Sequence, residues 1–261
     1  MSGSHPHLVP ADPTPQTTTA GAVCGAPAGA PTRAAPRRSA GDGVGPAARR
    51  TAPRVRRVRR VVVVHGYAAT PTDHWFTWLA DQLTAAGVEV AVPALPDPQE
   101  PDAAAWLATT AAAVEAAGGV DEHTHLVAHS LGCVTVLRHL ATLLPAPGDS
   151  TASGSWRLGG LTLVAGFTGP LPALPQLDGY LAEPATGGVP TLDEGVLQRI
   201  ADRTRRLNVL RSERDVYVPT TATDDLAARL GTRAQVVHGA GHFTADDGIT
   251  ALPPVLNTVT S

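Results

Sequence analysis

From residue 61 onward, short apolar runs alternate with longer segments whose apolar residues recur at helical spacing. Residues 61–65 (VVVVH) form a continuous apolar run, the kind of strand that a parallel sheet buries on both faces. Further strands are predicted over 88–92, 123–128, 161–164, 207–211 and 234–238, and helices over 70–86, 102–117, 131–144, 193–203, 221–230 and a short final segment. Such alternation indicates an α/β domain with a mostly parallel sheet of about six strands flanked by helices.

Two segments of this domain carry local signals. The helix over 70–86 is expected to begin with Thr70 as its cap, Pro71 at the first helical position and Asp73 in the first turn. Residues 167–190 are rich in proline and glycine. They predict an irregular loop that lines the substrate site or forms a small lid.

Residues 1–55 form a different kind of sequence, rich in Ala, Pro, Gly, Thr and Arg and poor in large apolar residues. Such a segment buries too little surface to offset its ordering entropy, so a disordered tail is predicted, with the folded domain over 56–261. The tail has no contiguous apolar core of a secretory signal. Residues 54–60 (RVRRVRR) carry charge that attracts nucleic acid or acidic membranes. A solvated lead-in to the first strand is the preferred interpretation, and no nucleic-acid partner is expected.

Composition and charge narrow the class of protein. The 261 residues are 43% hydrophobic, enough for one domain with a real core. Residues 1–60 hold 10 Arg and two acids (+8), and the other 201 hold 10 Arg and 21 acids (−11), which sum to −3. No apolar stretch approaches the roughly 20 residues that span a bilayer. Cys24 and Cys133 are placed as unpaired thiols rather than a disulfide framework, which favours a cytoplasmic location.

Residues 128–132 (AHSLG) carry the strongest chemical signal, because they stand between a predicted strand and a predicted helix. A serine presented on such a sharp turn is a nucleophile when a base removes its proton. Small residues must flank it two positions away on either side, and Ala128 and Gly132 meet this need, although Ala128 departs from the usual glycine. Ser130 is therefore the predicted nucleophile.

A histidine base and an acid that orients it complete such a site. His242 follows the last predicted strand in a glycine-rich loop (GAGHF), where a parallel sheet carries functional loops. His129 is expected to pack the turn instead. Asp215 follows the strand over 207–211, and the chain order Ser130, Asp215, His242 is that of hydrolases with this nucleophile turn. Rival acids remain: the nearer one is Glu213, whereas Asp224 and Asp225 are expected on an exposed helix.

The developing negative charge of an acyl-transfer transition state needs two backbone N–H donors. One is expected from Leu131 at the start of its helix, and the other from Tyr67 in the loop after the first strand. His65 is expected to be a structural hydrogen-bonding residue. Cys133 is expected in the core rather than as a nucleophile. A metal site at His65, Asp73 and His74 is disfavoured because the ligand spacing is not a recognised one, so no metal or cofactor is expected.

Four segments together, VVVVHGYAATPTDHWFTWL, LVAHSLGCVTVL, RSERDVYVP and GAGHF, resemble the small α/β-hydrolase family that includes retinoblastoma-binding protein 9 and the bacterial YdeN-type serine hydrolases. The similarity covers residues 60–258. It implies a compact α/β-hydrolase fold without a large cap domain, a triad of Ser130, His242 and Asp215, and hydrolysis of small esters. A serine esterase is therefore the leading hypothesis. The alternatives are a protein-binding module on a hydrolase scaffold and an acyltransferase that uses the same triad.

Overall fold

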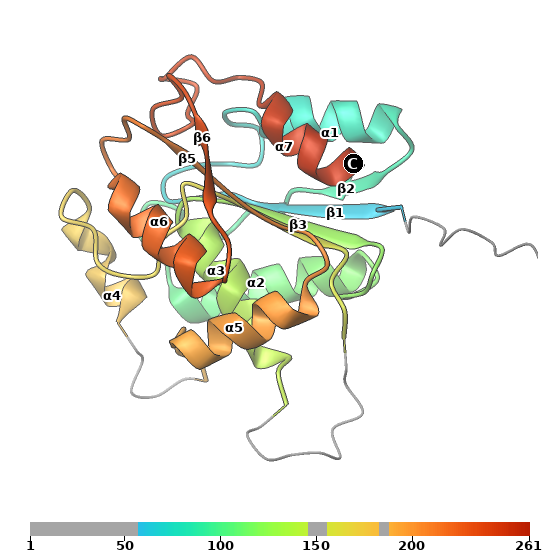
Figure 1. Ribbon diagram of the computed structural model, residues 1–261, viewed down its shortest axis with the longest axis horizontal. Helices are drawn as coiled ribbons and strands as arrows, with labels where there is room; N and C mark the ends of the chain where they lie inside the picture. The colour runs from blue at the N-terminus through green and yellow to red at the C-terminus, as the bar shows by residue number, and fades with distance from the viewer. Residues whose placement is uncertain (1–56, 146–155, 183–187) are drawn as a thin grey trace, which may run out of the picture. The chain divides into compact units, whose positions relative to one another are not determined.

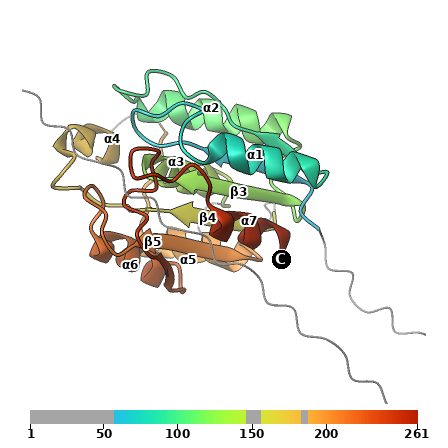
Figure 2. The same cartoon turned by 90° about the horizontal axis from the view of Figure 1, so that it is seen from above.

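Six strands form one sheet in which every neighbouring pair is parallel. The computed structural model describes residues 57–145, 156–182 and 188–261. Its strands are β1 (Arg60–Val64), β2 (Glu89–Ala91), β3 (Thr124–His129), β4 (Gly160–Val164), β5 (Leu207–Ser212) and β6 (Ala234–Val237). They lie in the order β2-β1-β3-β4-β5-β6 (Figures 1 and 2). The predicted parallel six-stranded sheet is confirmed.

Helices cover both faces of this sheet. One face carries α1 (Phe76–Ala85) and α7 (Pro253–Thr260), and the other carries α2 (Ala103–Ala116), α3 (Leu131–Thr142), α5 (Glu194–Arg203) and α6 (Thr220–Arg229) (Figure 1). The connection from β4 to α5 contains only two short helical pieces, η1 (Pro175–Leu177) and α4 (Asp178–Leu181), in its described part. The described chain therefore has no large cap domain, as the family resemblance implies.

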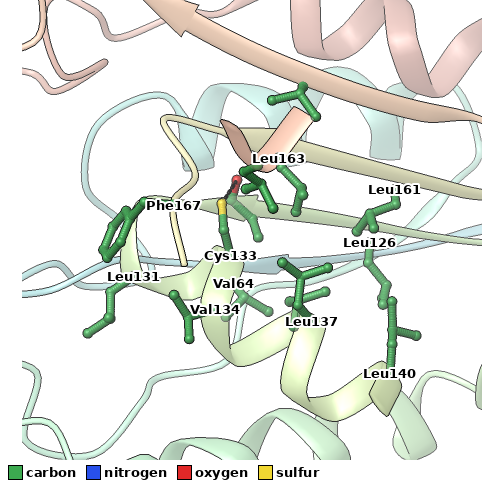
Figure 3. Close-up of a cluster of buried hydrophobic side chains, with 14 of the residues drawn as sticks. Val64, Leu126, Leu131, Cys133, Val134, Leu137, Leu140, Leu161, Leu163 and Phe167 are labelled. Atoms are coloured by element: carbon green, nitrogen blue, oxygen red, sulfur yellow. Dashed lines mark hydrogen bonds between the residues drawn. The ribbon is translucent and has the colours of Figure 1, made fainter. Parts of the chain in front are cut away.

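The sheet separates two hydrophobic cores, and β1 shows why. Its residues Val61 and Val63 belong to the core under α1 and α7, whereas Val62 and Val64 belong to the core under α2 and α3, and all four are fully buried. A strand covered on both faces needs apolar residues at every position, which accounts for the unbroken valine run. Figure 3 shows part of the larger core, where leucines of β3, β4 and α3 pack together.

The chain reverses its direction of travel across the sheet between β1 and β3. After β1 it moves outward to the edge strand β2 through α1 on one face, and after β3 it moves the other way through α3 on the opposite face. The loops that leave the carboxyl ends of β1 and β3 therefore diverge. Parallel α/β sheets bind their ligands in the crevice at such a switch point. Tyr67 and Ser130 lie in these two loops.

The predicted start of the first helix is wrong. Residues 70–75 form turns, and α1 begins only at Phe76. The carboxylate of Asp73 accepts a hydrogen bond from the Thr70 amide (2.7 Å), which closes a local turn rather than a helix. His74 then adopts a positive φ of 54°, a left-handed conformation that interrupts any helix.

Several sequence interpretations lie outside the described residues. These include the predicted disordered tail, the boundary between residues 55 and 56, and Cys24. Within the ranges 57–145, 156–182 and 188–261, no helix is long and apolar enough to cross a membrane.

A hydrogen-bonded series of largely buried polar side chains ties α7 to the sheet. Thr258 donates its hydroxyl hydrogen to the carbonyl of Val255 (2.7 Å), so its oxygen accepts from Thr162 (2.8 Å). The Thr162 oxygen in turn accepts from Nε2–H of His125 (2.8 Å). Burial lowers the pKa of His125 to about 3, so this ring is neutral near neutral pH. The bond from Thr258 to the carbonyl of Val255 therefore sets the direction of the other two hydrogen bonds in this series.

Thr162→Val is expected to lower the free energy of unfolding by about 1–3 kcal/mol. The substitution nearly keeps the side chain's volume but leaves the His125 Nε2–H without an acceptor inside the protein. Urea unfolding followed by circular dichroism measures the change. Thr142→Val is the control, because Thr142 is an exposed threonine whose hydroxyl donates to the carbonyl of His139 in its own helix turn. An equal loss of unfolding free energy in both variants would contradict a stabilising role for the hydrogen-bonded series through Thr162.

Candidate active site

Ser130 stands on a strained turn between β3 and α3. Its φ of 52° lies in a region that non-glycine residues occupy at a cost of about 1–3 kcal/mol. The turn tolerates no larger residue two positions later: a Cβ on Gly132 would lie 2.5 Å from the carbonyl oxygens of Val64 and His65. Two positions earlier, Ala128 is fully buried in its strand. The structure accommodates this alanine without disturbing the parallel pairing of β3.

The loop after β1 approaches the same turn at van der Waals distance. A Cβ on Gly66 would lie 2.9 Å from Cβ of Ser130 and 3.1 Å from the carbonyl oxygen of His129. Only glycine lets the two loops come this close. His65 secures the loop, since its Nε2 accepts from the amide of Leu95 (3.1 Å) and its Nδ1–H donates to the carbonyl of Gly66 (2.9 Å). Burial lowers the pKa of His65, which keeps Nε2 an acceptor. The expected structural role of His65 agrees with these contacts.

The structure brings Ser130, His242 and Asp215 into one hydrogen-bonded series. Nε2 of His242 lies 2.9 Å from Oγ of Ser130, and Nδ1 lies 2.7 Å from Oδ2 of Asp215. A carboxylate can only accept, so Nδ1 carries the ring proton and Nε2 is free to accept the serine hydroxyl hydrogen. The serine is 3% exposed, so the pair is shielded from bulk water yet open to one small pocket.

Asp215 is held in place by the turn that follows it. Its Oδ1 accepts hydrogen bonds from the amides of Tyr217 and Val218, each at 2.9 Å, which leaves Oδ2 for the His242 ring. The carboxylate is therefore fixed by three donors. The carboxylate held in this way orients the imidazole of His242 and can stabilise the positive charge that the ring gains when it takes a proton.

The rival acids lie elsewhere. Glu213 accepts from the amide of Gly239 (3.0 Å) on the surface. Asp224 pairs with Arg211, and the side chain of Asp225 is 67% exposed on α6. Neither of these two aspartates contacts His242, in agreement with their expected position on an exposed helix.

Two residues that sequence reasoning did not place in the site hold the main chain of His242. Its carbonyl accepts from Nε2–H of His129 (2.8 Å), and its amide donates to Oδ2 of Asp247 (2.8 Å). His129 is buried, and burial lowers its pKa well below the usual value, so it remains neutral. Gly241 must lack a Cβ, because one would lie 2.1 Å from Oδ1 of Asp247. The signal for Asp247 was present in the sequence as an acid in the polar turn after Gly-His-Phe.

The carboxylate of Asp247 is itself well bound. Burial acts to raise its pKa, but hydrogen bonds from the hydroxyl and amide of Thr244 and from the amide of His242 lower the pKa below its ordinary value. The charged form of Asp247 therefore persists beside the His242 loop, where it accepts the hydrogen bond from the His242 amide.

Leu131 and Tyr67, the residues predicted to supply the two backbone donors, lie next to Ser130 and in the lining of the small pocket, respectively. Leu131 is the first residue of α3, so its N–H has no partner within the helix. Tyr67 follows Gly66 and, like Ser130 and His242, lines the small pocket described next. The arrangement has the elements of an oxyanion hole, and its role remains a prediction.

A pocket of about 190 Å³ opens over Ser130 at the carboxyl end of the sheet. It is lined by Tyr67, Ala68, His74, His129, Ser130, Leu174, Tyr217, His242 and Thr244. Leu174 comes from the connection between β4 and α5, whose described parts (166–182 and 188–192) are called the wall segment below. The expectation that this region lines the substrate site agrees with the position of Leu174.

Two arginines fasten the wall segment to the helices beneath it. On α3, Arg138 donates to the carbonyls of Tyr180 (2.8 Å) and Leu181 (3.2 Å). On α6, Arg229 donates to Oγ1 of Thr168 (2.7 Å) and to the carbonyl of Leu192 (2.6 Å). The wall has little regular structure of its own, so these bonds set its position.

Other residues considered from the sequence have different roles. Cys133 is fully buried in the core of Figure 3, and burial raises the pKa of its thiol, so it is not an activated nucleophile. Asp73 and His74 bind the backbone amides of Thr70 and Ala245. In the described part of the chain, no three His, Cys, Asp or Glu side chains are grouped so as to hold a metal ion.

Comparison with known proteins identifies the family. The model of the family described as "Serine hydrolase" matches residues 61–261. This chain belongs to the serine hydrolase family. It is 36% identical over 203 residues to the Bacillus subtilis (strain 168) protein named "Putative hydrolase YdeN", which covers 78% of this chain and 95% of that protein.

Solved structures agree with this assignment. The crystal structure of the ydeN gene product from B. subtilis matches this serine hydrolase with a TM-score of 0.65 and 34% identity, over 77% of this chain and 97% of that one. A "putative yden-like hydrolase" from Pectobacterium atrosepticum matches with a TM-score of 0.50 and 16% identity, over 76% of this chain and 86% of that one. The second match bears on the fold alone. The chain is therefore a serine hydrolase with an α/β-hydrolase fold.

Proposed function

We propose that this serine hydrolase cleaves small carboxylic esters through an acyl-enzyme on Ser130. The observation that carries the proposal is the hydrogen-bonded series Ser130, His242, Asp215, whose serine and histidine line the small pocket. In a serine hydrolase, a serine with a free imidazole acceptor at 2.9 Å has a base for its proton at the moment of attack.

The reaction proceeds in two halves. His242 Nε2 takes the hydroxyl proton as Oγ of Ser130 bonds to the ester carbonyl carbon, and the amides of Leu131 and Tyr67 stabilise the resulting oxyanion. His242 then gives this proton to the alkoxy oxygen, so the carbon–oxygen bond breaks and the alcohol leaves. A water molecule attacks the acyl-enzyme in the same way and releases the acid and free Ser130. Asp215 stabilises the imidazolium in both halves.

Three coarser features complete the proposal. The proposed substrate is a small molecule, and no metal or cofactor takes part in the steps above. We also propose a cytoplasmic setting, because Cys133 is a free, buried thiol in the described part of the chain.

Treatment of the intact protein with a fluorophosphonate probe tests the mechanism. We expect one covalent adduct, on the peptide that contains Ser130, and loss of ester hydrolysis in proportion to labelling. Free acid should accumulate even when a second alcohol is added, which distinguishes hydrolysis from acyl transfer. A protein that neither reacts with the probe nor releases acid from any short ester is not an esterase, and the proposal fails.

A further inference from the structure

A second, larger pocket adjoins the small one over Ser130. It measures about 690 Å³ and is lined by Tyr67, Gln99, Glu100, Pro101, Asp102, Ala103, Ala104, Gln176, Gly179, Tyr180, Ala182 and Val189. The residue that both pockets share is Tyr67, which follows the tight approach of Gly66 to Ser130. An ester with its carbonyl carbon at Ser130 can therefore extend into two spaces of unequal size.

The position of His242 decides which part of the ester enters which space. The imidazole must hand its proton to the departing alkoxy oxygen, so the alcohol lies on the His242 side of the carbonyl. The small pocket is that side, because His242, Thr244 and Tyr217 line it. The lining of the large pocket contains no residue of the described loops that carry Asp215 and His242. The acyl group is thus directed past Tyr67 into the large pocket.

The volumes set the sizes of the two groups. The small pocket, at about 190 Å³, must also hold the ester linkage, so it has room for a small alcohol. The large pocket, at about 690 Å³, has more than three times this volume and holds a correspondingly larger group. Its near wall is fixed, because Arg138 binds the carbonyl of Tyr180 and the Tyr180 hydroxyl donates to Thr135 (2.6 Å).

The lining of the large pocket is polar and carries negative charge. Gln99 and Gln176 carry amides that both donate and accept, and Glu100 and Asp102 are acids, whereas no arginine or lysine is among the described residues that line it. An acyl group with N–H or O–H donors is matched to such a lining, and one with a terminal carboxylate meets negative charge.

We propose that this enzyme, if it is the esterase argued above, selects esters of a small alcohol with a long, polar, non-anionic acyl group. The juxtaposition of the small pocket at His242 and the large pocket beyond Tyr67 carries this inference. It goes beyond the reaction type, because it assigns the two ends of the substrate to two places in the fold.

A pair of isomeric esters tests the assignment on the wild-type enzyme. Methyl heptanoate and hexyl acetate have the same atoms but place the long chain on opposite sides of the ester. We expect kcat/KM for methyl heptanoate to exceed that for hexyl acetate by at least about tenfold, since a group forced into a pocket too small for it is discriminated by about 10–200-fold or more. Acid release at constant pH measures both rates. Equal rates, or a preference for hexyl acetate, would overturn the inference.

Two further methyl esters test the polarity at equal chain length. Methyl 4-acetamidobutanoate carries an N–H donor in a seven-atom acyl chain, and monomethyl heptanedioate carries a terminal carboxylate. We expect the amide to be turned over at least about as efficiently as methyl heptanoate, and the carboxylate at least about fivefold less efficiently, because its charge meets Glu100 and Asp102. A preference for the carboxylate would contradict the proposed polarity.

A matched pair of variants tests the place of the acyl group. Gly179 lines the large pocket and Gly169 lies on the wall segment outside both pockets, and an added Cβ at either position meets nothing within 4 Å. Gly179→Phe should lower kcat/KM for methyl heptanoate by at least about tenfold and that for methyl acetate by less than about threefold. Gly169→Phe should leave both unchanged. Equal effects of Gly179→Phe on the two esters would overturn the assignment.

The outcomes separate this inference from the proposed function. If the enzyme is labelled on Ser130 and prefers hexyl acetate, it is an esterase and the assignment of the two pockets is wrong. If no ester is hydrolysed and no label is incorporated, the proposed function fails, and this inference fails with it.

Discussion

Ser130→Ala is expected to abolish fluorophosphonate labelling and to lower kcat for ester hydrolysis by at least about 10⁴-fold. The alanine lacks the only group that can form the acyl-enzyme, and the oxyanion donors alone sustain little turnover. The fold should survive, because the Ser130 side chain caps no helix and its bond to His242 is part of the site rather than the core. Circular dichroism and thermal unfolding measure this survival.

Ser212→Ala is the matched control for the nucleophile. Ser212 is also buried, and its hydroxyl oxygen accepts a hydrogen bond from the amide of Arg214 (3.2 Å). This variant should react with the probe as the wild type does. If labelling persists in Ser130→Ala and disappears in Ser212→Ala, the nucleophile is Ser212 at the end of β5, and the proposed site is wrong.

Asp215→Asn is expected to lower kcat by at least about 10²-fold, and by about 10⁴-fold if the acid matters as much as in a serine protease triad. The larger value corresponds to about 5 kcal/mol of transition-state stabilisation. The structure gives the reason. The amides of Tyr217 and Val218 require an oxygen at the Oδ1 position, so the NH2 group of the asparagine must face Nδ1 of His242. The ring then carries its proton on Nε2 and cannot accept from Ser130.

Steady-state kinetics of two further variants serve as controls for this result. Asp225→Asn should change kcat by less than about threefold, because Asp225 is an exposed helix residue. Glu213→Gln should also leave most of the rate, since Glu213 binds Gly239 and not His242. An inactive Glu213→Gln together with an active Asp215→Asn would show that the acid has been misassigned.

Much of the fold could be predicted because its signals are local. The valine run of β1 and the apolar periodicity of α3 each reflect burial of that segment, and the strand–turn–helix around Ser130 follows from them. The candidate site could be predicted for a related reason. In a parallel sheet, the residues that follow the carboxyl ends of the strands meet at one edge. Because Ser130, Asp215 and His242 each follow a predicted strand, the sequence predicts that they lie close together.

The features that could not be predicted depend on contacts between distant segments. The turn at His74 replaces the expected helix start, and His74 Nδ1 accepts from the amide of Ala245 (3.1 Å), 171 residues further along the chain. The bond from His129 to the carbonyl of His242 likewise joins two loops. Neither contact produces a periodicity or a motif spacing in the sequence from which it could be predicted. The two pockets could not be predicted either, because their shape depends on where the wall segment lies.

The way in which Arg138 and Arg229 hold the wall segment bears on how substrate preference can diverge. Three of their four hydrogen bonds go to main-chain carbonyls, those of Tyr180, Leu181 and Leu192. Every amino acid supplies such a carbonyl, so the side chains of the wall can be exchanged while its attachment to α3 and α6 persists. The scaffold thus uncouples the anchoring of the wall from its sequence, and new specificities become accessible without rebuilding the hydrolytic centre.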